Sequence, residues 1–102
     1  MIKVTQLELW LETVNSKRET EWNSKFTHKP YEPLTHKIGR IYAKVMSGTS
    51  VWAFVSMGDN LKKGFNLGDL LKPASHKGPA NKSRGNILNG TASWGYYGPN
   101  YL

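Results

Sequence analysis

The chain has 102 residues, a usual size for one domain, and 38% of them are hydrophobic, which is enough for one modest core. It contains no cysteine, which excludes disulfides and thiolate metal sites, and no apolar run approaches the roughly 18 residues of a membrane span. The formal net charge is +7, and the whole excess lies in residues 36–84, which favours a polyanion or an acidic surface as partner.

A helix is predicted over about residues 6–25. Its apolar side chains recur at helical spacing and are expected to face the core: Leu7, Trp10, Leu11 and Val14. Thr5 and Glu8 match a capping box at its start. Glu21 and Lys25 form a favourable pair four positions apart near its end.

Strands are predicted after the helix. Pro30 and Pro33 end the helix, and an extended linker follows. A β-hairpin is expected over about residues 38–56, because hydrophobic and polar side chains alternate on both sides of a turn at residues 47–50. Residues 67–72 are predicted to form a third, shorter strand.

The last third of the chain has weaker signals. Residues 72–86 are predicted to be a long basic loop, because they contain proline, glycine, serine and asparagine with little periodicity. Residues 87–88 are predicted to form a short strand, with a hairpin turn at residues 89–90. The tail, residues 94–102, is aromatic and uncharged, so we expect it to dock on the core.

The sequence carries no enzyme signature. It has no cysteine nucleophile, phosphate-binding loop, dinucleotide fingerprint or zinc-protease motif. Asp59 and Asp69 lie among turn residues and are predicted to cap turns rather than to form a catalytic pair. His28, His36 and His76 lack metal-ligand spacing. We therefore predict no catalytic residue, no metal and no cofactor.

The hairpin offers the first candidate binding surface. Arg40, Tyr42 and Lys44 alternate onto one face of the first arm, and Trp52 and Phe54 are expected to share a face of the second. If the register places these rings beside Tyr42, bases can stack on them while the cations hold phosphates. Alternatively the rings fill the core under the helix. The core is the favoured place for Phe54, and both places stay open for Trp52.

The basic loop offers the second candidate surface. Its candidate nucleic-acid contacts are Lys72, His76, Lys77, Lys82 and Arg84. The Arg84 guanidinium can bind a phosphate in bidentate fashion, or it can tie the loop to a carbonyl or to Asp69. The loop can also be merely solvated.

A motif in the second half of the chain is carried by residues 68–75, Lys77, residues 79–80 and residues 84–87. It resembles the motif G-D-x-x-K-(A/P)-A-S-x-K-x-P-A-x-x-x-R-G-N-I of an uncharacterised family of small tailed-bacteriophage proteins. The ending, residues 97–102, is also similar to the ending of that family.

The chain departs from the family at two aromatic positions. His76 stands where the family has tryptophan, and Trp52 stands where it has histidine. The resemblance implies a phage origin and action in the cytoplasm of the infected bacterium, and it implies no activity.

The predicted fold is α+β and forms one domain, residues 1–102. One N-terminal helix packs on a small antiparallel sheet of three or four strands, with a long basic loop. The predicted function is non-enzymatic binding of single-stranded or duplex nucleic acid with little sequence preference. The alternative is a phage effector that binds and inhibits an acidic host protein of transcription, the nucleoid or defence, and a minor structural role in the particle is a third possibility.

Overall fold

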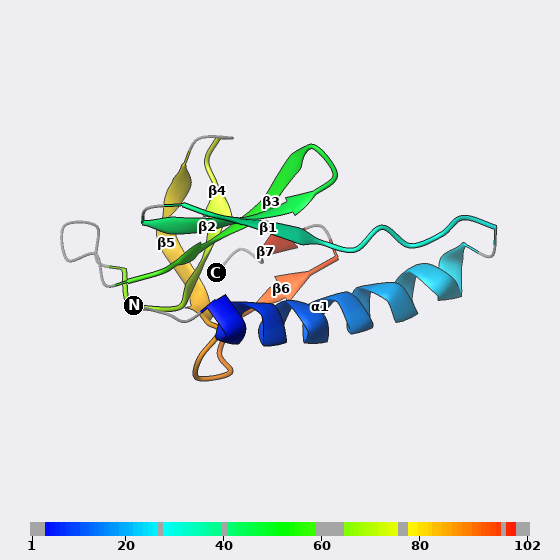
Figure 1. The fold of residues 1–102 in the computed structure, drawn as a ribbon, viewed down its shortest axis with the longest axis horizontal. Helices are drawn as coiled ribbons and strands as arrows, with labels where there is room; N and C mark the ends of the chain where they lie inside the picture. Colours follow the sequence, from blue (N-terminus) through cyan, green and yellow to red (C-terminus); the bar gives the residue numbers. More distant parts are fainter. Residues whose placement is uncertain are drawn as a thin grey trace.

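Helix α1 runs along one side of an antiparallel sheet (Figure 1). The structure is a computed structural model and describes residues 4–26, 28–39, 41–58, 65–75, 78–96 and 98–99. Its elements are α1 (Val4–Lys25), β1 (Thr35–Ile38), β2 (Tyr42–Ser47), β3 (Ser50–Ser56), β4 (Asp69–Pro73), β5 (Pro79–Asn86), β6 (Trp94–Gly95) and β7 (Gly98–Pro99). The α+β fold is confirmed, and the main sheet has five strands where three or four were predicted.

Helix α1 spans 22 residues and packs its apolar stripe on the sheet, as predicted. The stripe consists of Leu7, Trp10, Leu11 and Val14. The predicted pair of Glu21 and Lys25 is confirmed, with 3.8 Å between Oε1 and Nζ. The predicted N-cap is wrong, because the helical conformation already begins at Val4 and places Thr5 inside the first turn.

The main sheet is a meander in the order β1-β2-β3-β4-β5, with β1 and β5 at its edges. The predicted hairpin is confirmed in β2 and β3, which a two-residue turn joins between Ser47 and Ser50. Gly48 adopts a φ of +62° in this turn, which favours glycine. The predicted third strand is confirmed as β4. The additional strands are β1, which follows the predicted linker, and β5.

The sheet has two buried faces. The helix face packs against α1 and includes Ala43, Val55 and Leu70, which lie side by side in the register. The outer face lies on the other side of the sheet and carries a smaller cluster of Phe54, Phe65 and Leu71. Successive side chains of a strand point to opposite faces of the sheet. Wherever the pairing is regular, the face of each neighbouring residue therefore follows from these clusters.

A β-bulge in the β2–β3 hairpin decides the position of Trp52. The register shifts between Val45 and Met46, which leaves Trp52 as an extra residue on β3. Trp52 is buried in the helix-face cluster, whereas Phe54 lies in the outer-face cluster. The prediction that the two rings share a face is therefore wrong, since one extra residue shifts the alternation along the strand.

The predicted basic loop of residues 72–86 is mostly two paired strands. It contains the end of β4 and the whole of β5, which pair antiparallel with two register shifts. Between them, Gly78 O accepts from the backbone N–H groups of Ala74 and Ser75 at 3.1 and 3.2 Å. The loop prediction is wrong because backbone hydrogen bonds to β4 hold β5 in a strand. The segment is polar and contains glycine, so its sequence shows no hydrophobic alternation that would predict a strand.

A hydrogen-bonded corner joins the start of β4 to the end of β5. The Asn86 side-chain amide donates to Leu67 O at 2.6 Å and to Asp69 Oδ1 at 3.1 Å. Asp69 Oδ2 accepts from the Asn66 N–H at 2.8 Å, so the prediction that Asp69 caps a turn is confirmed. Residues 87–90 form a turn, and the strand predicted at residues 87–88 is wrong.

The C-terminal aromatic segment docks on the helix side of the sheet, as predicted, where the structure describes it. The Trp94 ring lies 6.0 Å from the Trp52 ring in an edge-on arrangement. Strands β6 and β7 pair with each other between α1 and the sheet (Figure 1). Residues 97 and 100–102 lie outside the described residues, and so does Asp59.

Candidate functional site

Tyr42 and Lys44 of the predicted hairpin surface lie on a different face of the sheet from Lys72 of the predicted basic loop. Tyr42 and Lys44 belong to the outer face, because Lys44 pairs with Phe54 of the outer cluster. Lys72 follows Leu71 of the outer cluster and therefore points to the helix face. There its Nζ donates to Pro99 O at 3.0 Å. Among these described residues, the structure thus does not bring Lys72 together with Tyr42 and Lys44.

Two other predicted contacts are core residues. Trp52 is 4% exposed, and its indole N–H donates to Tyr96 O at 2.9 Å, so the alternative in which it fills the core is confirmed. Arg84 is 7% exposed on β5, which leaves little of its side chain for a phosphate. Its burial favours the structural alternative, and bidentate phosphate binding by Arg84 stays a prediction.

The structure describes one of the four remaining predicted contacts. Lys82 is exposed on the edge strand β5. Arg40, His76 and Lys77 lie outside the described residues, so their assignment as nucleic-acid contacts stays a prediction.

The outer face carries a basic pair that sequence reasoning missed. Lys37 on β1 lies directly opposite Lys44 on β2, and Lys44 lies opposite Phe54 on β3. Like charges placed opposite each other on neighbouring strands destabilise a sheet by up to about 1 kcal/mol. The sequence analysis missed this pair because it predicted no strand at Lys37.

An apolar groove adjoins the lysine pair. It has a volume of about 410 Å³ and is lined by Lys37, Ile38, Gly39, Ile41, Tyr42, Lys44 and Phe54. The Tyr42 ring packs edge-on against Phe54 at 6.0 Å, which fixes its position at the groove. Ile38 and Ile41 are 46% and 49% exposed. Apolar surface beside two cations suits a ligand that is anionic and flat.

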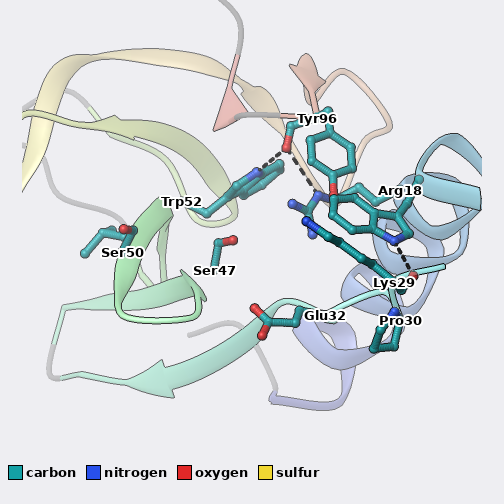
Figure 2. Close-up of a pocket in the computed structure, with 10 residues that line it drawn as sticks. Arg18, Lys29, Pro30, Glu32, Ser47, Ser50, Trp52 and Tyr96 are labelled. Carbon is teal, nitrogen blue, oxygen red and sulfur yellow. Dashed lines mark hydrogen bonds between the residues drawn. The ribbon is translucent and has the colours of Figure 1, made fainter. Parts of the chain in front are cut away.

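A cluster of aromatic rings surrounds Arg18 on the helix side, and Figure 2 shows Arg18 with Trp52 and Tyr96. The guanidinium carbon of Arg18 lies 4.2 Å from the centroid of the Tyr96 ring, 5.5 Å from Tyr31 and 5.9 Å from Trp52. Arg18 Nε donates to Tyr96 O at 3.2 Å, and Nη1 donates to the Tyr31 hydroxyl at 2.8 Å. Arg18 is 4% exposed, so the rings replace most of the water around a permanent charge.

The Tyr31 hydroxyl connects this cluster to the segment after α1. It donates to Asn15 Oδ1 at 2.6 Å, and the same oxygen accepts from the Leu34 N–H at 2.7 Å. Burial raises the pKa of Tyr31 above its ordinary value of 10.0, and the hydrogen bond from Arg18 partly offsets this rise. The phenol therefore stays protonated and keeps its role as a donor to Asn15.

We expect the stability of the protein to fall above about pH 10 in a way that depends on Tyr31. The pKa of Tyr31 is about 10 in the unfolded chain and higher in the folded protein. The stabilisation that the protonated phenol contributes is therefore fully present below pH 10. It is lost as the pH rises through the folded-state pKa. Urea unfolding of wild type and Tyr31→Phe between pH 8 and pH 11 measures this loss. A stability difference that stays constant over this range contradicts the assignment.

A cleft of about 580 Å³ opens beside the Arg18 cluster, between the second half of α1, residues 29–32 and the β2–β3 turn. Sequence analysis did not select Arg18 as a functional residue. Arg18 stands four positions after Val14, in line with the buried apolar side chains of the helix. A charged residue is rarely buried without a partner, so this position was the signal in the sequence.

Other chemistry is sparse in the part of the chain that the structure describes. No three histidine, aspartate or glutamate side chains gather there as a metal site. His28 is exposed and His36 is half-buried on β1. No helix in the described ranges is both long and apolar enough to cross a bilayer.

The chain matches no protein-family model, no curated protein and no solved structure. The resemblance to small tailed-bacteriophage proteins therefore stays a prediction. The structure does give a physical role to several residues that carry it. Gly68, Asp69, Gly85 and Asn86 all belong to the β4–β5 corner, where Ile87 N donates to Gly68 O at 3.0 Å. The resemblance thus predicts a shared corner of the fold more directly than a shared binding site.

Proposed function

We propose that this protein is a non-enzymatic nucleic-acid-binding protein that uses the outer face of β1 and β2. The observation that carries the proposal is the register pairing of Lys37 with Lys44 beside the Tyr42 groove. Two lysines at facing positions of neighbouring strands attract a phosphate backbone, and each phosphate contact releases condensed counterions. The formal net charge of +7 adds a long-range attraction for a polyanion.

The groove next to the lysine pair supports stacking of bases rather than reading of their edges. Among the residues that the structure describes, its lining contains Tyr42 and two exposed isoleucines and no arginine, asparagine or glutamine. Those three residue types make most bidentate contacts with base edges. Stacking on a ring contributes about 1–3 kcal/mol per base and tolerates any sequence. Single-stranded nucleic acid is therefore the favoured form, because its bases are free to stack.

The phage origin and the site of action belong to the same proposal. The resemblance in residues 68–87 supports a protein of a tailed bacteriophage that acts in the cytoplasm of the infected bacterium. A basic protein with little sequence preference would there coat or capture single-stranded nucleic acid.

The experiment is fluorescence anisotropy with a labelled single-stranded oligonucleotide and a matched duplex at two salt concentrations. We expect Lys37→Gln and Lys44→Gln each to weaken binding and to lower the salt slope by about 0.7 to 0.9, the contribution of one phosphate. Lys17→Gln is the matched control, since it removes the same charge from an exposed position on α1. No binding of wild type to either nucleic acid at low salt contradicts the proposal, as does an equal loss in all three variants.

A second candidate function is binding and inhibition of an acidic host protein. The specific observation in its favour is that β1 is an edge strand with an exposed isoleucine, Ile38, beside Lys37. An edge strand can pair with a strand of a partner, and the lysines can meet its carboxylates. This candidate is favoured if the oligonucleotides do not bind and if the protein still captures a partner from a nuclease-treated bacterial lysate. The Ile38→Glu substitution is then expected to abolish this capture.

A further inference from the structure

The cleft beside Arg18 has the size and the lining of a small-molecule site. Its volume of about 580 Å³ falls within the range of ligand pockets, about 300–1,000 Å³. Three rings, Trp22, Trp52 and Tyr96, contribute to its walls, and Ser47 and Ser50 supply hydroxyls at the β2–β3 turn. In Figure 2 the side chains of Arg18 and Lys29 both point into the cleft.

The charges of the cleft are not neutralised by one another. Within the described residues, the structure gives no ion pair to Arg18, Lys29 or Glu32, although all three line the cleft. The two hydrogen bonds of Arg18 go to neutral oxygens, the Tyr96 carbonyl and the Tyr31 hydroxyl. A guanidinium has five N–H groups, so its donor capacity is not exhausted by these bonds. A cation that is 4% exposed and donates to two neutral oxygens favours an incoming anion.

We propose that this cleft binds a small organic ligand that carries one singly charged oxyanion next to a flat ring. The two cations and one carboxylate of the lining sum to one positive charge, which matches a carboxylate or a phosphodiester. The oxyanion lies at Arg18 and Lys29, and the flat ring packs on Trp22. Glu32 lies at a different part of the rim and accepts a hydrogen bond from a donor group of the ligand.

This site is independent of the proposed nucleic-acid interface. Lys37 and Lys44 lie on the outer face, whereas Arg18 and Trp52 lie on the helix side. A substitution in one site therefore leaves the other intact, and either proposal can fail without the other.

Two of the four tryptophans report on the cleft directly. The Trp22 indole N–H donates to Lys29 O at 2.9 Å, and the Trp52 indole N–H donates to Tyr96 O at 2.9 Å. Their N–H resonances are well placed to sense a ligand between these walls, whereas Trp10 and Trp94 do not line the cleft. The four signals are assigned in ¹⁵N-labelled protein by single Trp→Phe substitutions.

The experiment titrates labelled protein with indole-3-acetate and with a 3′,5′-cyclic mononucleotide, which carry a carboxylate and a phosphodiester. The neutral analogues indole-3-acetamide and the nucleoside are the controls, and inorganic phosphate tests the oxyanion without a ring. We expect at least one charged probe to shift the Trp22 and Trp52 signals and to bind about tenfold more tightly than its neutral analogue, the effect of one charge-assisted hydrogen bond. The probe that binds more tightly identifies the oxyanion.

Variants then test the named residues. Lys29→Gln is the main test, because Lys29 is exposed and its loss leaves the core unchanged, and we expect it to weaken the charged probe several-fold. Lys17→Gln removes the same charge from an exposed position of α1 outside the cleft lining and is expected to leave binding unchanged. The proposal is overturned if no probe shifts the two signals, if charged and neutral probes bind equally, or if Lys29→Gln and Lys17→Gln behave alike.

Discussion

Replacement of Gly85 by alanine is expected to abolish cooperative folding or to lower the free energy of unfolding by about 4 kcal/mol or more. Gly85 has a φ of +94°, which is unfavourable for any residue with a Cβ. A Cβ at this position would also overlap the Thr91 carbonyl and lie 2.8 Å from the Ala92 Cα. These atoms belong to the backbone of the returning chain, so the corner must open to make room.

Gly90→Ala is the matched control for this prediction. Gly90 has a φ of +77°, and a Cβ there meets nothing within 4 Å. It therefore isolates the conformational strain, which costs about 1–2 kcal/mol. Urea unfolding followed by tryptophan fluorescence gives both values. If the two variants lose the same stability, the close approach of the chain at Gly85 has no energetic role.

Replacement of Arg18 by leucine is expected to lower the free energy of unfolding by about 3 kcal/mol. The substitution removes two hydrogen bonds from a charged donor and the contacts of the guanidinium with three rings. It also leaves the Tyr31 hydroxyl and the Tyr96 carbonyl with one partner fewer. The apolar leucine side chain recovers part of this loss by filling the space.

The control for Arg18 is its neighbour on the same helix. Lys17 is exposed, so Lys17→Leu is expected to change stability by no more than about 0.5 kcal/mol. The same urea experiment compares them. An Arg18→Leu protein that is as stable as Lys17→Leu would mean that the rings, without the cation, hold the helix to the tail.

The elements predicted best from the sequence are those with a strong period. The stripe of Leu7, Leu11 and Val14 gave α1 its position, and alternation on both sides of Gly48 gave the β2–β3 hairpin. Both periodic patterns are local, because they depend only on the hydrophobicity of residues that are one helical turn apart or alternate along a strand.

The errors arise where the structure depends on pairing between distant segments. Strand β5 is polar and contains Gly85, so only its register with β4 makes it a strand. The bulge at Val45 and Met46 turns Trp52 toward the helix and cannot be located from alternation, because an extra residue leaves no mark in composition.

The candidate sites were predictable only in part. Tyr42 and Lys44 were assigned to one face, and the structure places them together on the outer face. Lys37 completes that surface from a separate strand, and the Arg18 cleft is assembled from four separate parts of the chain. Spacing along the sequence carries no information about such assemblies.

The bond from Arg18 to Tyr96 spans 78 positions, and it ties the first helix to the last described strands. During synthesis, the helix emerges from the ribosome long before Tyr96. The Arg18 guanidinium therefore stays in water until the segment that carries Tyr96 has also emerged. Until that segment docks, the newly made chain exposes the Trp52 indole, which is buried in the folded protein.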